Sequence, residues 1–173
     1  RGGPVVIDGI VYFAAGIWPS DGVYLHALDA KTGAPLWSNG ETGKIFMAQP
    51  HGGAEAESVV SAQGYLVASG DQLIVPTGRA VPAFFERKTG ALRFYQLQKN
   101  AQRGGTRAMV SDRFLFNAGC LFDMQTGDLS SQIGLGPAVA VGNGVVQSDG
   151  RSLKASKWED AQIVDRKGQN QQV

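Results

Sequence analysis

The chain has 173 residues, of which 43% are hydrophobic and 18% are charged, and its formal net charge is +1. This composition can supply a hydrophobic core and excludes disorder on compositional grounds. Its near-zero charge, with basic residues scattered along the chain, excludes the basic patch of a nucleic-acid-binding protein. No stretch approaches the roughly 20 apolar residues of a membrane helix, so we expect no membrane span.

The first elements along the chain are predicted to be short β-strands. Apolar runs at 5–7 and 10–14 flank the turn signal Asp8-Gly9 and predict a hairpin. The stretch GVYLHALDA predicts a third strand, and TGAPLW turns and begins a fourth. Further on, AEAES (54–58) has local helix propensity but is too short to form an independent helix.

The stretch ALDAKTGAPLW (27–37) recurs in weaker form along the chain. FFERKTGALRF (84–94) and LFDMQTGDLSS (121–131) keep an acidic residue and the glycine four positions later, whereas IVDRKGQNQQV (163–173) keeps only the acidic residue and some turn character. Two β runs joined by a polar turn precede each copy. Four β units of roughly 35 to 45 residues indicate the blades of a β-propeller. The acidic positions are Asp29, Glu86, Asp123 and Asp165.

The predicted fold is all-β, with about four four-stranded antiparallel propeller blades in a single region, 1–173. The chain opens RGGPVVIDG without a methionine and ends in the polar DRKGQNQQV. We therefore expect part of a larger seven- or eight-bladed propeller. Two alternatives stay open: a homodimer that closes an eight-bladed ring, and a compact four-bladed propeller. The expected blades are 1–45, 58–98, 104–134 and 135–173, with an insertion loop at 46–58.

Residues of the first copy have predicted structural roles. Thr32-Gly33 supplies a positive φ where the third strand turns back, and Asp29 is expected to accept hydrogen bonds from the amides of that turn. Trp37 is expected to bury its ring against the neighbouring blade and to donate its indole N–H to an acceptor. The motif positions across the copies are Ala27, Asp29, Gly33, Trp37, Glu86, Gly90, Phe94, Asp123 and Gly127.

The pattern A-x-D-x-x-x-G-x-x-x-W at 27–37 resembles the tryptophan-docking repeat of the PQQ-like, or quinoprotein-type, β-propellers. The resemblance covers essentially the whole chain and is strong in the first copy only. In the second copy, Phe84, Glu86 and Phe94 replace the small residue, the aspartate and the tryptophan. Fold does not fix function, so the resemblance bears mainly on architecture.

The resemblance implies two different possible functions. Some members of this family are PQQ-dependent dehydrogenases that hold the cofactor and Ca²⁺ at the propeller centre, and others are cofactor-free binding scaffolds outside the cytoplasm. The dehydrogenases have a vicinal Cys-Cys pair, whereas this chain has only Cys120, which we expect to be a small buried residue. We predict a non-catalytic, extracytoplasmic scaffold with a protein or polymer partner and no cofactor. The alternative is a fragment of a PQQ-dependent dehydrogenase, with PQQ and Ca²⁺, whose catalytic residues lie outside this chain.

Four residues are candidate contacts with a ligand or partner, and no catalytic or metal-binding residue is predicted. Arg79 and Arg107 lie beside glycines and have the chemistry to pair with carboxylate or phosphate; a salt bridge or a surface loop is the alternative for both. Trp18, beside a proline in GIWPSDG, is a candidate anchor for a partner or a cap on the core. His51 lies near two glutamates in HGGAEAE, but this spacing matches no standard ligand set, which favours a solvated loop.

Overall fold

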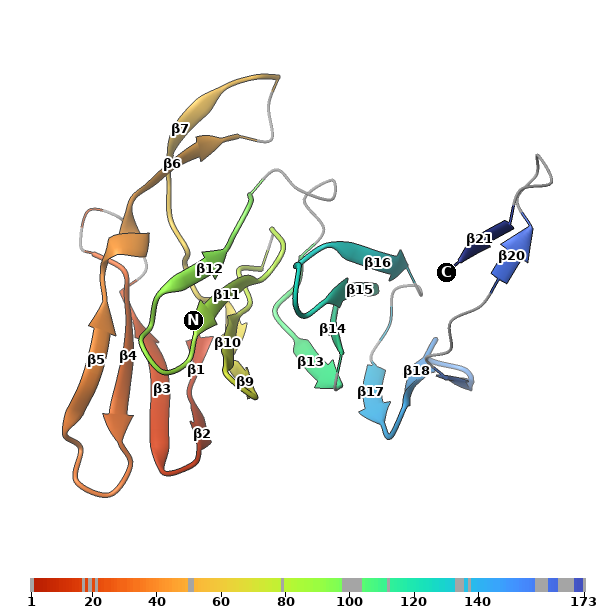
Figure 1. Ribbon diagram of the computed structural model, residues 1–173, viewed down its shortest axis with the longest axis horizontal. Helices are drawn as coiled ribbons and strands as arrows, with labels where there is room; N and C mark the ends of the chain where they lie inside the picture. The colour runs from red at the N-terminus through yellow and green to blue at the C-terminus, as the bar shows by residue number, and fades with distance from the viewer. Residues whose placement is uncertain are drawn as a thin grey trace. The chain divides into compact units, whose positions relative to one another are not determined.

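The computed structural model describes residues 2–16, 18, 20, 22–49, 52–78, 80–97, 104–111, 113–132, 136, 138–157, 162–164 and 170–172. Across these ranges the fold is built from β-strands arranged in three four-stranded sheets, one three-stranded sheet and three two-stranded pairings (Figure 1). The all-β, blade-type fold predicted from the sequence is confirmed. Two compact units, 1–108 (unit 1) and 109–173 (unit 2), are described in turn.

Within the described ranges, no helix has the length and apolar character needed to cross a membrane.

Sheet 1 of unit 1 is an up-and-down meander in which each strand pairs antiparallel with the next. Its first turn has positive φ angles at both Asp8 (51°) and Gly9 (74°), as a two-residue hairpin turn of the primed type requires. The sequence therefore predicted these strands well. Sheet 1 consists of β2 (Val5–Ile7), β3 (Ile10–Ala15), β4 (Tyr24–Asp29) and β5 (Pro35–Asn39).

Sheet 2 of unit 1 repeats this meander, and its pairings are also antiparallel. A parallel pairing of β1 (Gly2–Gly3) with β8 (Gly64–Tyr65) links the segments that lead into sheets 1 and 2. Sheet 2 consists of β9 (Val67–Ser69), β10 (Gln72–Val75), β11 (Ala83–Glu86) and β12 (Leu92–Phe94).

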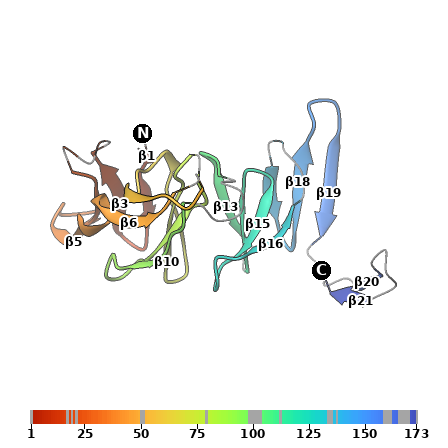
Figure 2. The same cartoon turned by 90° about the horizontal axis from the view of Figure 1, so that it is seen from above.

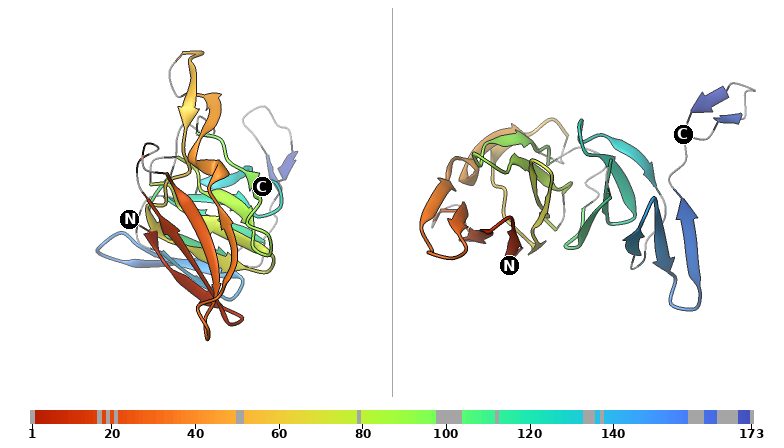
Figure 3. Two further views of the ribbon diagram at one scale, coloured as in Figure 1. Left: turned by 90° about the vertical axis from the view of Figure 1, so that its left-hand side faces the viewer. Right: turned by 60° about the horizontal axis from the view of Figure 1, so that its bottom comes forward.

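The segment between the two sheets begins with the 3-10 turn η2 (Glu41–Gly43). The range 46–58, expected as an insertion loop, contains most of a hairpin of β6 (Ile45–Ala48) and β7 (Glu55–Ser58). The helix propensity of AEAES is overridden there because the backbone of β7 pairs with β6. Figures 1 and 3 show this hairpin projecting beyond the strands of sheet 1.

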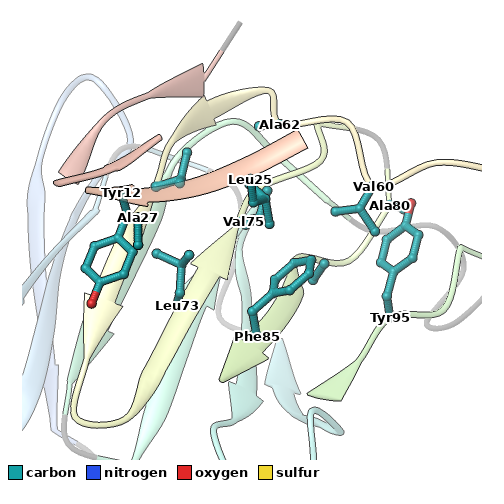
Figure 4. Close-up of a cluster of buried hydrophobic side chains, with 12 residues drawn as sticks. Tyr12, Leu25, Ala27, Val60, Ala62, Leu73, Val75, Ala80, Phe85 and Tyr95 are labelled. Atoms are coloured by element: carbon teal, nitrogen blue, oxygen red, sulfur yellow. The ribbon is translucent and has the colours of Figure 1, made fainter. Parts of the chain in front are cut away.

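The core of unit 1 lies between sheets 1 and 2. Figure 4 shows side chains of sheet 1 and of sheet 2 gathered in one cluster. Burying a large apolar side chain contributes about 1.5 to 3 kcal/mol, so this contact is a principal source of the stability of unit 1. The buried cluster comprises Tyr12, Leu25, Ala27, Val60, Ala62, Leu66, Leu73, Val75, Ala80, Ala83, Phe85 and Tyr95.

Unit 2 contains sheets 3 and 4. Cys120 is 1% exposed, as expected for a small apolar residue, and β18 and β19 form a hairpin that Figure 2 shows in blue. Sheet 3 consists of β13 (Ala108–Ser111), which starts at the unit boundary, β14 (Phe114–Asn117), β15 (Cys120–Asp123) and β16 (Leu129–Gln132). Sheet 4 consists of β17 (Ala138–Val141), β18 (Gly144–Ser148) and β19 (Leu153–Lys157), and a separate pairing joins β20 (Gln162–Val164) to β21 (Asn170–Gln172).

The register of sheet 4 corrects the alignment of the fourth repeat copy. Val146 pairs with Ala155 as Tyr12 pairs with Ala27 in sheet 1. The third strand of sheet 4 is therefore β19 and not the segment before Asp165. Asp165 itself lies outside the described residues. The alignment failed because it followed the acidic residue, and β19 ends in a lysine.

Candidate functional site

The strands of unit 1 alternate in direction, so the connections of each sheet fall at two opposite ends. At the turn end lie the short connections 8–9 and 30–34 of sheet 1 and 70–71 and 87–91 of sheet 2. At the other, the loop end, lie the longer connections and the projecting hairpin. The β1–β8 pairing joins the loop ends of the two sheets.

The turn that closes β4 and β5 is held by Asp29. Its Oδ1 accepts hydrogen bonds from the backbone N–H of Lys31 (3.0 Å), the backbone N–H of Thr32 (2.7 Å) and the Thr32 hydroxyl (2.8 Å). Gly33 completes the turn with a φ of 73°. The hydrogen bond from the Thr32 hydroxyl, followed by those from the Thr32 and Lys31 amides, lowers the pKa of Asp29. The carboxylate therefore stabilises the turn, as the sequence predicted.

Two turns of unit 2 use the same device. Asp123 accepts from the amides of Gln125 (2.8 Å) and Thr126 (3.1 Å); partial burial acts to raise its pKa, but these hydrogen bonds prevail and the pKa is lowered. Asp149 accepts from the amides of Ser152 (2.7 Å) and Arg151 (2.8 Å), which lower its pKa in that order. Asp149 was missed because it follows the second strand of its sheet rather than the third.

Trp37 docks sheet 1 onto the turn end of sheet 2. Its indole Nε1–H donates to the carbonyl of Arg87 at 3.0 Å. Its ring lies over Gly90, where a Cβ atom would stand 2.5 Å from the ring carbon Cε3. Asn39 Nδ2 donates to the Gly90 carbonyl at 2.6 Å. This is the interaction with the neighbouring sheet that the sequence predicted for Trp37.

Ion pairs complete the turn end of unit 1. Arg87 Nη2 lies 2.7 Å from Asp8 Oδ2 and so connects sheet 2 to sheet 1. Arg93 Nη2 lies 2.5 Å from Asp71 Oδ2 and also pairs with Glu86. The hydrogen bond from Arg93 lowers the pKa of Asp71. The carboxylates of this end are thus used in its own turns and ion pairs.

The loop end presents large aromatic side chains to solvent. Trp18 in the β3–β4 connection is 66% exposed, Phe46 on β6 is 67% exposed, and Tyr65 on β8 is 72% exposed. Trp18 is therefore no cap on the core. The Tyr65 ring lies over Gly3, where a Cβ atom would be 2.2 Å from Cδ1. Of these three aromatics, only Trp18 was named from the sequence as a candidate contact.

A hollow of about 340 Å³ lies between β6 and the residues that follow β12. Tyr95 in its lining is 8% exposed, and burial raises the pKa of its phenol. Among the residues that the structure describes, the lining consists of Met47, Ala48, Tyr95, Gln96 and Leu97, of which only the Tyr95 phenol is ionisable.

The other candidate contacts are only partly described. Arg107 is exposed in the segment before β13, whereas Arg79 and His51 lie outside the described residues. Among the residues that the structure describes, no three His, Cys, Asp or Glu side chains come together as a metal site. The carboxylates of Asp8, Asp29, Asp71 and Glu86 at the turn end of unit 1 are engaged in their own turns and ion pairs.

No family model matches the sequence, and no curated protein matches it. Solved structures do match. BamB from Moraxella catarrhalis is 20% identical with a TM-score of 0.58, over 90% of this chain and 46% of that one. The computationally designed Ika4 protein is 16% identical with a TM-score of 0.55, over 89% and 88% of the two chains. The designed Ika8 protein is 17% identical with a TM-score of 0.54, over 90% and 45%.

The chain therefore spans less than half of the BamB and Ika8 chains and most of the Ika4 chain. Likeness at this level of identity shows the fold. The chain has the fold of the PQQ-like β-propellers, as the pattern at 27–37 predicted.

Proposed function

We propose that this chain is a non-catalytic binding scaffold of the PQQ-like propeller type, which holds a protein or polymer partner at the loop end of unit 1. The observation that carries the proposal is the exposure of Trp18, Phe46 and Tyr65 at that end, each at 66% or more. Buried tryptophan and tyrosine side chains supply a large share of the binding energy at protein interfaces. Their presence on one end of a rigid unit favours an interaction surface there.

The shape of this end favours a macromolecule over a small ligand. The three aromatics come from three separate segments, and the hairpin that carries Phe46 projects from sheet 1 (Figure 3). Small-ligand sites are concave and bury most of the ligand, with a few convergent polar groups. The described residues that line the hollow beside Tyr95 include no such set of charged groups. A broad partner that covers the aromatics from outside suits this arrangement.

The remaining sequence candidates enter the proposal as secondary contacts. Arg107 is exposed and has the chemistry to pair with an acidic group of the partner; Arg79 and His51 are assigned the same secondary role. The proposed location outside the cytoplasm rests on the resemblance to the PQQ-like propellers. The proposal includes no cofactor, and PQQ with Ca²⁺ belongs only to the dehydrogenase alternative.

The experiment compares three forms of the chain as bait in an extracytoplasmic extract of the organism that encodes it. They are the unaltered chain, the loop-end variant Trp18→Ser/Phe46→Ser/Tyr65→Ser, and the matched turn-end variant Lys31→Ser/Lys88→Ser/Ala91→Ser, whose three positions are also exposed. A cross-linked partner is identified by mass spectrometry and its Kd is then titrated. We expect the loop-end variant to weaken binding roughly 10-fold or more and the turn-end variant to bind as the unaltered chain does. Equal binding by all three forms would contradict the proposal.

A separate titration tests the dehydrogenase alternative. PQQ with Ca²⁺ is added to the folded chain and followed by calorimetry and by the absorbance of the quinone. We expect no saturable heat and no spectral shift. Stoichiometric binding would overturn the non-catalytic assignment whatever the result with protein partners.

A further inference from the structure

Two sheet faces of the molecule carry apolar side chains that are exposed or only partly buried. One is the face of sheet 1 that points away from sheet 2, called here the receiving face. The other is one face of sheet 4 in unit 2, called here the docking face. The receiving face comprises Val6, Val11, Phe13, Tyr24, His26 and Leu28, and the docking face comprises Val139, Val141, Val146, Leu153 and Ala155.

The receiving face has a covered counterpart in sheet 2. Leu73 pairs with Phe85, and Val75 with Ala83, as Val11 pairs with Leu28, and Phe13 with His26, in sheet 1. These four positions of sheet 2 are all 0% exposed, in the cluster they share with Tyr12, Leu25 and Ala27 of sheet 1. In sheet 1, by contrast, the counterparts of these four positions are only partly buried. On the same face, Val6 is 62% exposed and Tyr24 is 42% exposed. The receiving face is thus built as a surface that another sheet covers.

The docking face is the counterpart of the side of sheet 1 that does the covering. Ala155 opposes Val146, and Leu153 opposes Ser148, as Ala27 opposes Tyr12, and Leu25 opposes Ala14. In sheet 1 the residues Tyr12, Leu25 and Ala27 are at most 1% exposed.

On sheet 4 the counterparts of Leu25 and Ala27, which are Leu153 and Ala155, are exposed, and Val146, the counterpart of Tyr12, is partly buried. Val139 is 62% exposed, Val141 is 58% exposed and Leu153 is 76% exposed.

Two equivalent glycines also indicate that sheet 1 has a surface that another sheet could cover. Gly33 and Gly90 occupy equivalent turns, with φ angles of 73° and 75°. The surface of Gly90 is covered by the Trp37 ring, whereas a Cβ atom built at Gly33 would have nothing within 4 Å. The turn of sheet 1 therefore keeps an open platform of the kind on which an aromatic ring docks in sheet 2.

We propose that a second copy of this chain covers these faces, with the docking face of one copy packed on the receiving face of the other. The contact would repeat the packing of sheet 1 on sheet 2 within unit 1. It is head-to-tail, because the two faces are different surfaces of one chain. A second copy is the favoured occupant because each copy has both a docking face and a receiving face.

If the head-to-tail contact closes on itself, two copies form a dimer with two equivalent contacts between docking and receiving faces. If it does not close, copies add on to form longer assemblies. Light scattering during gel filtration over a range of concentrations measures the molar mass against the 18.3 kDa of one chain. We expect a dimer. A monomer at all concentrations would overturn the proposal and leave the faces to further sheets of a longer chain or to another protein.

Complementation between two variants tests which faces meet. Val6→Asp blocks the receiving face and Val139→Asp blocks the docking face, and both positions are 62% exposed, so both variants should fold. Each variant alone should lose self-association by about 100-fold or more, because an unpaired carboxylate is buried at the contact. Mixed one to one, they should form mixed pairs, since one intact contact remains.

The control is Ala91→Asp, which places the same charge at an exposed turn position of unit 1 and should associate as the unaltered chain does. Circular dichroism establishes that all three variants are folded. Self-association of the Val6→Asp chain alone would indicate that like faces meet and would overturn the head-to-tail contact. A mixture that stays monomeric would overturn it as well.

Discussion

Two tryptophans stand at opposite ends of unit 1. Trp37 lies over Gly90 and donates its indole N–H to the Arg87 carbonyl of sheet 2, whereas Trp18 is 66% exposed in the β3–β4 connection. Both belong to the same unit and both follow turn-forming residues. What separates them is a neighbouring sheet that supplies a glycine platform and a carbonyl acceptor. An aromatic ring in this fold is therefore part of the scaffold or free for contacts according to the surface opposite it, not according to its own hydrophobicity.

The largest effect is expected when the same substitution is made at both tryptophans. Trp37→Ala should lower the free energy of unfolding of unit 1 by about 3 kcal/mol or more, because it removes the ring between two sheets and leaves a cavity. Trp18→Ala should stay within about 0.5 kcal/mol of the unaltered chain, as is usual for surface positions. Equilibrium denaturation in urea measures both values. Similar losses for the two variants would break the comparison.

Substitutions at two glycines test how tightly the Trp37 ring packs on its glycine platform. Gly90 and Gly53 both have positive φ angles, 75° and 80°, so alanine at either costs about 1 to 2 kcal/mol in backbone strain. At Gly90 the added methyl also meets the Trp37 ring, whereas at Gly53 nothing lies within 4 Å. Gly90→Ala should therefore destabilise unit 1 by about 1 to 3 kcal/mol more than Gly53→Ala. Denaturation midpoints of the pair give the difference, and equal midpoints would show that the platform is not tightly packed.

Acid should weaken the turns that aspartate carboxylates hold. The pKa values of Asp29, Asp123 and Asp149 are lowered in the folded chain, so these groups bind protons less readily than in the unfolded chain, where the aspartate pKa is about 3.9. Their contribution to stability is present above that value and is lost as the pH falls through the folded pKa values.

Urea midpoints measured from pH 7 down to pH 3 should therefore decline in the acid range. Asp29→Asn, which keeps an acceptor in the turn but no charge, should show a shallower decline. An unchanged slope in this variant would mean that the Asp29 carboxylate is not linked to stability.

The smallest effect is expected for the projecting hairpin. Phe46 is 67% exposed, so Phe46→Ser should change the free energy of unfolding by no more than about 0.5 kcal/mol. The same variant should weaken partner binding under the proposed function. A large loss of stability would instead place Phe46 in the scaffold and remove it from the binding surface.

The parts of the fold that depend on local chemistry could be predicted from the sequence. Asp8-Gly9 specified a hairpin turn, and the hydrogen bonds of Asp29 follow from the reach of a short carboxylate to amides two and three residues ahead. The docking of Trp37 also followed from its position in the repeat. These features need no knowledge of distant residues.

The parts that were missed depend on distant partners. The strand β7 forms in an Ala- and Glu-rich segment because β6 pairs with it, and strand propensity is decided by such context. In the sequence, Tyr65 looks like an ordinary strand aromatic. Only the structure shows that its ring lies over Gly3 and is exposed. Sheet 4 was misaligned because Lys157 stands where the other copies have an acidic residue. Only the register of the strands reveals that Ala155 corresponds to Ala27.

The pairing of β1 with β8 has a kinetic consequence. It joins Gly2 to Gly64, so it closes a loop that contains all of sheet 1 and the hairpin, whereas the meanders of both sheets form between sequence neighbours. Closing a long loop costs more chain entropy than closing a turn, and contacts of high sequence separation slow folding. This short parallel ladder is therefore expected to form after the two meanders. Once formed, it ties the start of the chain to the entry into sheet 2, so that the first sheet cannot fray from its outer end without breaking a link to the second.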